Sequence, residues 1–111
     1  MRSVHFIGVG GVGMNGLAQL AVQSGYIVSG SDRAYHPTSR PFDVLEKMGI
    51  RITPQDGTGI SEQTETVVYS TAIESDNPDL TVARECGIPL LHRAEFLKEL
   101  IGSDDLIAVA G

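Results

Sequence analysis

Short apolar runs alternate with amphipathic segments along the chain. Residues 4–9 form an apolar run rich in β-branched side chains, which predicts a buried parallel strand. Apolar residues recur at helical spacing over residues 14–24, up to Gly25, and strand character returns over residues 26–29. This order predicts a β-α-β unit at the start of the chain.

The alternation continues to residue 101. The later predicted elements are, in chain order, a helix from about Pro41 to Gly49, strands over residues 50–53 and 66–70, a helix from Asn77-Pro78 to about Cys86, a strand over residues 88–91 and a helix over residues 94–101. Thr38 or Ser39 is a candidate cap for the first of these helices. Residues 54–65 predict a polar loop with at most one helical turn. Together the elements predict a Rossmann-like α/β fold, with an open, mostly parallel five-stranded sheet and helices on both faces.

Residues 103–111 depart from this pattern. Asp104-Asp105 is followed by an apolar run over residues 106–110 and then by Gly111, which predicts a buried strand leading into a glycine turn. We therefore expect residues 1–102 to form one domain and residues 103–111 to be a linker and the first strand of a second domain. On this hypothesis the chain is the N-terminal piece of a longer protein.

Composition narrows the possible partners. The net charge is −6 and no cluster of lysines and arginines occurs, so neither nucleic acid nor an anionic membrane is an expected partner. The single cysteine, Cys86, cannot form an internal disulfide, and no apolar stretch reaches the roughly 18 residues that a membrane helix needs. We expect a cytoplasmic protein.

The spacing Gly8-x-Gly10-x-x-Gly13 follows the first predicted strand and opens the first predicted helix. In this setting the glycines allow a tight turn, close approach of a diphosphate and close packing of helix on strand. The phosphates would lie at the helix N-terminus, where free N–H groups and the helix dipole favour an anion. The alternative is a strand-to-helix turn that needs glycine for packing alone. The candidate phosphate-binding residues are Gly8, Gly10, Gly11, Val12, Gly13, Met14 and Asn15.

Other candidates follow later strands at the same edge of the predicted sheet. Asp32 ends the second strand, roughly twenty residues beyond the glycine turn, where an acidic residue binds ribose hydroxyls in NAD enzymes. Alternatively, Asp32 only caps a turn. The loop after the fourth strand could bind a base or sugar, or satisfy its own backbone. Its residues are Ser70, Thr71, Ala72 and Ile73. His92 and Arg93 follow the fifth strand and could approach an anionic ligand.

Neither catalysis nor metal binding is predicted within the chain. His5 lies inside the first strand, where a structural role is expected. No histidine has a partner at metal-ligand spacing, and the sequence has neither a nucleophile–base pairing nor a G-x-x-x-x-G-K-[ST] loop. The chain alone is predicted to be a binding domain.

The motifs taken together resemble the start of the Mur ligases. The matching segments are, in order, HFIGVGGVGM (residues 5–14), VSGSD (28–32), VVYSTAI (67–73), DNP (76–78), ARE (83–85), GIP (87–89), RAE (93–95) and AVAG (108–111). In that family the last segment precedes the ATP loop, where Thr-His-Gly-Lys-Thr would follow. Two places depart from the family pattern. Asn15 stands where a serine is frequent, and Pro54-Gln55-Asp56-Gly57 stands where a Gly-His pair is expected.

This resemblance implies a specific nucleotide ligand. The N-terminal domain of Mur ligases binds the UDP part of UDP-N-acetylmuramate, and their central domain binds ATP and Mg²⁺. The resemblance therefore implies that residues 8–14 hold the diphosphate and that Asp32 and residues 70–73 meet the uridine. In the whole enzyme the muramyl carboxylate would be activated as an acyl phosphate and attacked by an amino acid. That amino acid is L-alanine in the members to which the likeness is strongest, and the reacting groups would lie outside this chain.

Three alternatives stay open. Residues 33–37 are also similar to family members that recycle murein tripeptide onto UDP-N-acetylmuramate, which would keep the nucleotide and change the second substrate. An NAD-binding domain of a dehydrogenase would account for the glycine spacing and Asp32 alone. A ligand-sensing regulatory module of the same fold is the third alternative.

Overall fold

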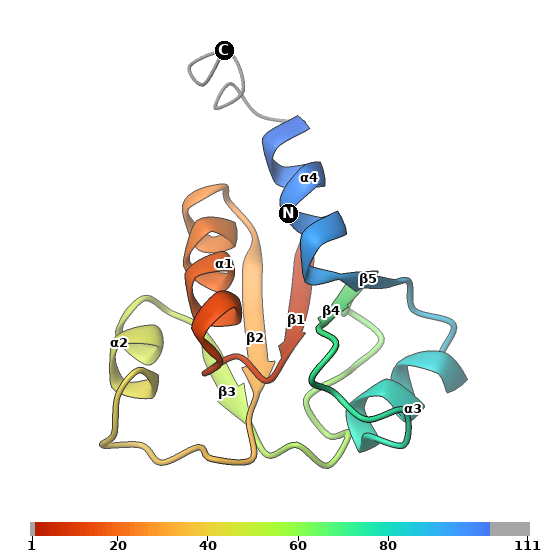
Figure 1. The fold of residues 1–111 in the computed structure, drawn as a ribbon, viewed down its shortest axis with the longest axis horizontal. Helices are drawn as coiled ribbons and strands as arrows, with labels where there is room; N and C mark the ends of the chain where they lie inside the picture. Colours follow the sequence, from red (N-terminus) through yellow and green to blue (C-terminus); the bar gives the residue numbers. More distant parts are fainter. Residues whose placement is uncertain (1, 103–111) are drawn as a thin grey trace.

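Five parallel strands form one sheet in the order β3-β2-β1-β4-β5 (Figure 1). The computed structural model describes residues 2–102. The strands are β1 (Ser3–Ile7), β2 (Ile27–Ser31), β3 (Arg51–Thr53), β4 (Thr66–Tyr69) and β5 (Leu90–His92). Each neighbouring pair is parallel. The predicted fold class is therefore confirmed, whereas the strand predicted over residues 106–110 lies outside the described residues.

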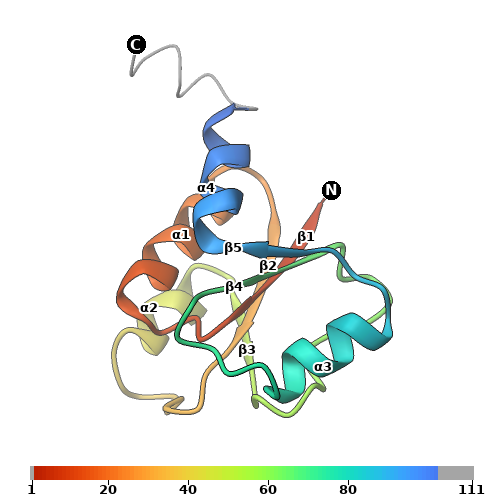
Figure 2. The same cartoon turned by 45° about the vertical axis from the view of Figure 1, so that its right-hand side comes forward.

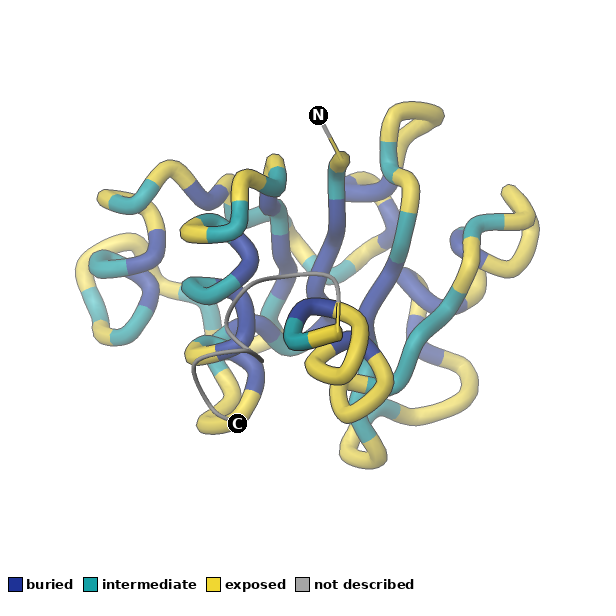
Figure 3. The backbone as a smooth tube through the Cα atoms, turned by 90° about the horizontal axis from the view of Figure 1, so that it is seen from above, coloured by how far each residue is buried: buried dark blue, intermediate teal, exposed yellow. Residues whose placement is uncertain are grey.

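Helices cover both faces of the sheet. The helices α1 (Val12–Gln23), α2 (Phe42–Lys47) and α4 (Arg93–Gly102) pack on one face, and α3 (Pro78–Glu85) packs on the other (Figure 2). Because successive side chains of a strand point to opposite faces, Phe6 packs with α1 and α4, whereas Ile7 packs with α3. The buried positions accordingly follow the central strands, and the exposed positions follow the loops (Figure 3).

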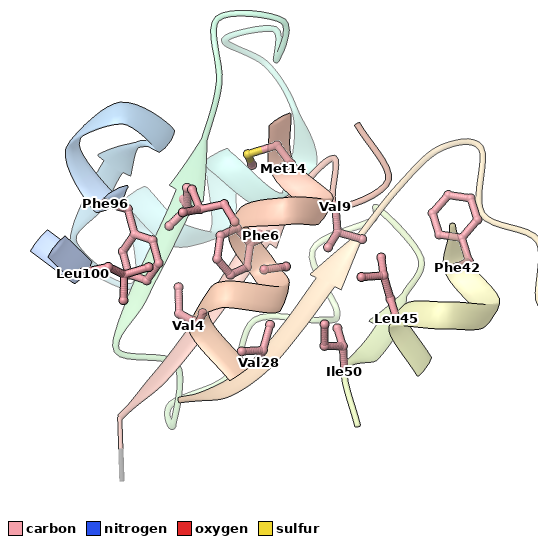
Figure 4. Close-up of a cluster of buried hydrophobic side chains, with 14 residues drawn as sticks. Val4, Phe6, Val9, Met14, Val28, Phe42, Leu45, Ile50, Phe96 and Leu100 are labelled. Atoms are coloured by element: carbon pink, nitrogen blue, oxygen red, sulfur yellow. The ribbon is translucent and has the colours of Figure 1, made fainter. Parts of the chain in front are cut away.

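The larger apolar core lies between the sheet and the helices α1, α2 and α4 (Figure 4). Phe96 of α4 packs edge-on against Phe6 of β1 and against Tyr26, with ring centroids 5.5 Å apart in each pair. Edge-to-face aromatic pairs of this kind add to the area that each ring buries. Since α4 begins where β5 ends, this packing holds Arg93 at the carboxyl edge of the sheet, beside α1.

The predicted cap of α2 was wrong. The N-cap of α2 is Pro41, without a side-chain cap, because Thr38 and Ser39 instead hydrogen-bond to His36 within the preceding loop. Residues 54–65 form a loop without a helix, which agrees with the predicted loop of at most one helical turn, and Ile60 in this loop is buried against the α3 face. Within residues 2–102, no helix is both long and apolar enough to cross a membrane.

Candidate functional site at the carboxyl edge of the sheet

The end of β2 holds in place the glycine turn, which is the segment over residues 8–13 between β1 and α1. The N–H groups of Gly8 and Val9 both donate to the Ser31 carbonyl oxygen, at 2.8 and 2.9 Å. The next N–H group, that of Gly10, donates to the Asp32 carboxylate at 2.9 Å. Gly8 has φ +79°, a left-handed conformation that residues with a side chain rarely adopt. Three consecutive backbone donors of the turn are therefore used within the protein.

Two later donors of the turn stay unpaired. At the start of α1 the N–H groups of Met14 and Asn15 donate to the Gly11 carbonyl oxygen at 3.1 and 2.9 Å. By contrast, the N–H groups of Val12 and Gly13 have no hydrogen-bond partner in the part of the chain that the structure describes. Free N–H groups in the first turn of a helix, together with the positive end of its dipole, form an anion-binding site.

A cavity of about 310 Å³ lies against these free donors. Its walls come from the loops that follow β1, β2 and β4, from the first turn of α1 and from the first residue of α4. The lining residues are Gly8, Gly11, Val12, Gly13, Met14, Asp32, Ser70, Ala72, Ile73 and Arg93. All of them belong to the set predicted from the sequence, so the fold gathers segments far apart in the chain around one space.

Arg93 supplies a positive charge at this cavity. A Cβ atom placed on Gly13 would lie 3.1 Å from the Arg93 Nη1 atom, so the guanidinium rests against the bare face of the glycine. Among the ion pairs of residues 2–102 none involves Arg93. Its charge is therefore directed at the same place as the free N–H groups of Val12 and Gly13, and an anion there would meet two kinds of donor, backbone N–H groups and a guanidinium.

Asp32 faces the cavity and also binds the backbone. Its Oδ1 atom accepts from the Ala34 N–H at 2.9 Å, while Oδ2 accepts from the Gly10 N–H. Asp32 therefore closes a turn and also lines the cavity. Each carboxylate oxygen retains a second lone pair that could accept from a ligand hydroxyl.

Four of the predicted residues do not line the cavity. They are Gly10, Asn15, Thr71 and His92. A Cβ on Gly10 would lie 2.6 Å from the Phe42 ring, so its bare face packs inward. The Asn15 side chain donates to the Gly11 carbonyl oxygen at 3.0 Å, and Thr71 is exposed in its loop.

His92 is engaged with the start of α4. Its Nδ1 atom accepts from the Ala94 N–H at 3.2 Å, and its own backbone N–H donates to Glu95 Oε1 at 2.9 Å. The ring also packs edge-on against Tyr69, with centroids 5.6 Å apart. His92 therefore holds the helix that presents Arg93 rather than facing the cavity itself.

An ion pair that the sequence did not predict joins two loops at this edge. Arg33 donates to both carboxylate oxygens of Glu74, at 2.7 and 2.5 Å. This bidentate hydrogen bonding lowers the pKa of Glu74 and raises that of Arg33. The paired residues directly follow Asp32 and Ile73, both of which line the cavity. No local pattern links residues so far apart in sequence, so only the fold reveals the pair.

A larger cavity, of about 660 Å³, lies at the amino edge of the sheet. Ser29, Arg51 and Gln63 are among its lining residues. Open α/β sheets bind ligands beyond the carboxyl ends of their strands, where the free helix N-terminus also lies. We therefore take the 310 Å³ cavity as the candidate site. Over residues 2–102 no group of three or more His, Cys, Asp or Glu side chains could hold a metal ion.

Comparison of the sequence with known proteins finds Mur ligases among its most similar relatives. A family model described as "Mur ligase family, catalytic domain" matches residues 3–104. The UDP-N-acetylmuramate–L-alanine ligase of Burkholderia cenocepacia is 41% identical over the whole chain, which spans 23% of that protein. The ligase of the same name from Solidesulfovibrio magneticus is 45% identical over the whole chain, which spans 24% of it. The chain thus spans about a quarter of the length of these relatives.

Solved structures agree with this likeness. The UDP-N-acetylmuramate-alanine ligase of Thermotoga maritima superposes with a TM-score of 0.82 at 26% identity, over 93% of this chain and 23% of that one. The UDP-N-acetylmuramate:L-alanyl-γ-D-glutamyl-meso-diaminopimelate ligase of Neisseria meningitides superposes with a TM-score of 0.77 at 28% identity. The superposition covers 89% of this chain and 31% of that one. An imine reductase from Myxococcus stipitatus, in complex with NAD⁺, superposes with a TM-score of 0.55 at 19% identity, over 83% of this chain and 40% of that one. At this identity the likeness shows a shared fold alone. Since the family model matches nearly the whole chain, the chain belongs to the Mur ligase family.

Proposed function

We propose that this chain is the domain of a Mur ligase that binds UDP-N-acetylmuramate. The observation that carries the proposal is the convergence of the free Val12 and Gly13 N–H groups and the unpaired Arg93 guanidinium on one cavity. The names of the alanine-adding relatives and of the Neisseria meningitides ligase both contain UDP-N-acetylmuramate. A shared nucleotide substrate is the simplest account of that likeness.

The charges of the site suit a diphosphate. The chain carries a net charge of −6, so the anion must be attracted locally rather than by the protein as a whole. Backbone donors at a helix N-terminus and a guanidinium provide that local attraction without a basic surface. Gly13 has no side chain, which lets a phosphate oxygen approach the backbone between Val12 and Arg93.

The uridine would occupy the side of the cavity formed by Asp32 and the loop after β4. The spare lone pairs of the Asp32 carboxylate would accept from ribose hydroxyls. Ser70, Ala72 and Ile73 offer one hydroxyl and two apolar side chains to the base or sugar. The residues that line the cavity would be the ones that contact the nucleotide.

The remaining chemistry of the ligase would belong to other parts of the protein. Residues 2–102 do not fit ATP or Mg²⁺, because the sequence has no G-x-x-x-x-G-K-[ST] loop and the structure offers no metal-binding cluster over those residues. We propose that residues 1–102 are the substrate-binding domain of a cytoplasmic ligase and that residues 103–111 lead to its ATP-binding part. ATP would supply the phosphoryl group that activates the muramyl carboxylate toward L-alanine.

Titration of the folded 111-residue chain tests this proposal. We expect saturable binding of UDP-N-acetylmuramate and of UDP, and binding of UMP at least tenfold weaker, because UMP lacks the second phosphate. NADH should show no saturable binding. Folded chain that fails to bind UDP-N-acetylmuramate at millimolar concentration would contradict the proposal, and saturable NADH binding would favour the dehydrogenase alternative.

A second candidate concerns the amino-acid partner alone. The likeness to the Neisseria meningitides ligase, at a TM-score of 0.77, favours a ligase that joins a peptide to the same nucleotide. Both candidates predict the same ligand for this chain. Product formation by the full-length protein from UDP-N-acetylmuramate and ATP, with either L-alanine or L-alanyl-γ-D-glutamyl-meso-diaminopimelate, distinguishes them.

A further inference from the structure

A fully buried carboxylate lies on the face of the sheet that α3 covers. Asp79, near the start of α3, is 0% exposed. Its Oδ2 atom accepts from Ser31 Oγ at 2.5 Å and lies 2.9 Å from His5 Nε2, while Oδ1 accepts from the Gly57 N–H at 2.7 Å. Burying a charge is costly unless it is paired, so three donors on one carboxylate indicate a defined structural task.

The hydrogen bonds keep this carboxylate ionised. Burial raises the pKa of Asp79, whereas the hydrogen bonds from His5, Ser31 and Gly57 lower it. The hydrogen bonds have the larger combined effect, so the pKa lies below its ordinary value. An ionised carboxylate only accepts, so His5 Nε2 carries the proton. The other ring nitrogen, Nδ1, lies 2.8 Å from the Ser29 hydroxyl oxygen, within hydrogen-bond distance.

Gln55 fastens the loop after β3 to the same hydroxyl. Its Nε2 atom donates to Ser31 Oγ at 3.3 Å, and its Oε1 atom accepts from Asn77 Nδ2 at 2.9 Å. Asn77 in turn caps α3 by accepting from the Asp79 N–H at 2.9 Å. Gln55 belongs to the segment that departs from the family pattern, and this network is what the residue does in this chain.

Ser31 connects the network to the candidate site. Its side chain is held by Asp79 and Gln55, while its carbonyl oxygen accepts from the Gly8 and Val9 N–H groups. We propose that Asp79, acting through Ser31, is a positioning residue for the glycine turn, although it lies on the opposite face of the sheet from α1. Fixing Ser31 fixes the turn, and with it the direction of the free N–H groups of Val12 and Gly13.

The alternative is a network that only stabilises the domain. The chain offers a matched pair of variants to separate the two. Ser29 and Ser31 lie on the same strand and each gives one hydroxyl to this network, but only the carbonyl of Ser31 holds the turn. Ser31→Ala and Ser29→Ala therefore remove the same group, with different expected consequences for the turn.

Amide hydrogen exchange of the 111-residue chain measures the turn without any ligand. We expect Ser31→Ala to speed the exchange of the Gly8 and Val9 N–H groups at least fivefold more than Ser29→Ala does, after correction for the unfolding free energy of each variant. Asp79→Asn keeps the shape of the side chain and should act in the same direction as Ser31→Ala. If Ser31→Ala does not fold, Asp79→Asn tests the positioning role in its place. Equal exchange in the Ser31 and Ser29 variants, or an Asp79→Asn variant that leaves Gly8 and Val9 protected, would overturn the proposal.

The ligand part of the inference rests on the proposed function and is measured separately. UDP should bind Ser31→Ala about fivefold more weakly than it binds Ser29→Ala. If the unmodified chain does not bind UDP, the proposed function fails while the exchange result still decides the role of Asp79. If the unmodified chain binds UDP and both serine variants bind it equally, the positioning role fails while the proposed function stands.

Discussion

The Asp32 carboxylate accepts a hydrogen bond from the Gly10 N–H at 2.9 Å, so an acidic side chain occupies a backbone donor in the middle of the glycine turn. Its other oxygen binds the Ala34 N–H at 2.9 Å. A negative charge therefore lies at the edge of a cavity whose remaining donors favour an anion. This arrangement suits a ligand that carries a diphosphate at one end and hydroxyl groups next to it.

Replacing Asp32 by asparagine should affect two ligands in opposite directions. For UDP we expect roughly tenfold weaker binding, because the charge-assisted hydrogen bonds to the ribose hydroxyls are lost. For inorganic pyrophosphate, which has no ribose, removal of the negative charge should leave binding unchanged or strengthen it. Calorimetric titration of both ligands checks this. A parallel loss for both would show that Asp32 only shapes the turn.

Local patterns in the sequence were sufficient to predict the carboxyl edge of the sheet. Glycine spacing and apolar periodicity report on single strands and helices, and a parallel sheet then brings the ends of β1, β2 and β4 to one edge. The cavity at this edge is therefore lined by predicted residues only. Whether these residues bind a ligand is still a prediction.

Contacts between distant segments could not be predicted in this way. His5 in the first strand signalled a buried polar residue, but nothing in the sequence identifies Asp79 as its partner. The packing of Phe42 beneath Gly10 likewise depends on where α2 lies on the sheet. Such pairs are set by the tertiary arrangement, and polar residues at apolar positions indicate only that some partner exists.

Gly10 and Gly13 should respond differently to alanine. In Gly10→Ala the new Cβ lies 2.6 Å from the Phe42 ring, so overpacking should lower the unfolding free energy by about 1–3 kcal/mol. In Gly13→Ala the new Cβ lies 3.1 Å from the far end of the long Arg93 side chain, which can rotate aside, so stability should stay close to that of the unmodified chain. Urea unfolding measures both.

Ligand binding completes the comparison between the two glycines. Gly13→Ala should weaken UDP binding, since the methyl group covers the bare backbone beside the free N–H groups and displaces the guanidinium. A Gly13→Ala variant that binds UDP normally would argue against a phosphate at this place. A Gly10→Ala variant as stable as the unmodified chain would contradict the packing against Phe42.

Arg93→Ala should weaken UDP binding by roughly tenfold, because a charge-assisted hydrogen bond contributes about 1.5–3 kcal/mol before screening by solvent. Lys98→Ala is the matched control, since it removes the same charge from an exposed position of the same helix without touching the cavity. Arg93→Lys should recover only part of the affinity, because an ammonium cannot reproduce the planar guanidinium fork. Titration at two salt concentrations should show a weaker salt dependence for Arg93→Ala only. Equal effects of Arg93→Ala and Lys98→Ala would show a general charge effect.

The stability of the chain should carry an acid-dependent contribution from Asp79. The pKa of Asp79 is lowered in the folded chain, because its hydrogen bonds outweigh the effect of burial, whereas in the unfolded chain it should be near 3.9. A carboxyl whose pKa is lower in the folded state stabilises that state above the unfolded pKa, and the contribution is lost as pH falls through the folded value. Asp79→Asn should therefore be less stable than the unmodified chain by about 1–3 kcal/mol at pH 7.

The difference between the two chains should shrink as the pH falls below about 4. Asp56 and Glu74 also have lowered pKa values, through hydrogen bonds from Thr58 and Arg33 respectively. Both are present in the variant as well, so their acid dependence cancels in the difference. Urea unfolding of the unmodified chain and of Asp79→Asn between pH 7 and pH 3 measures this difference in unfolding free energy. A difference that does not change over this range would mean that the charge of Asp79 contributes nothing and that the loss comes only from replacing an acceptor oxygen by a donor amide group.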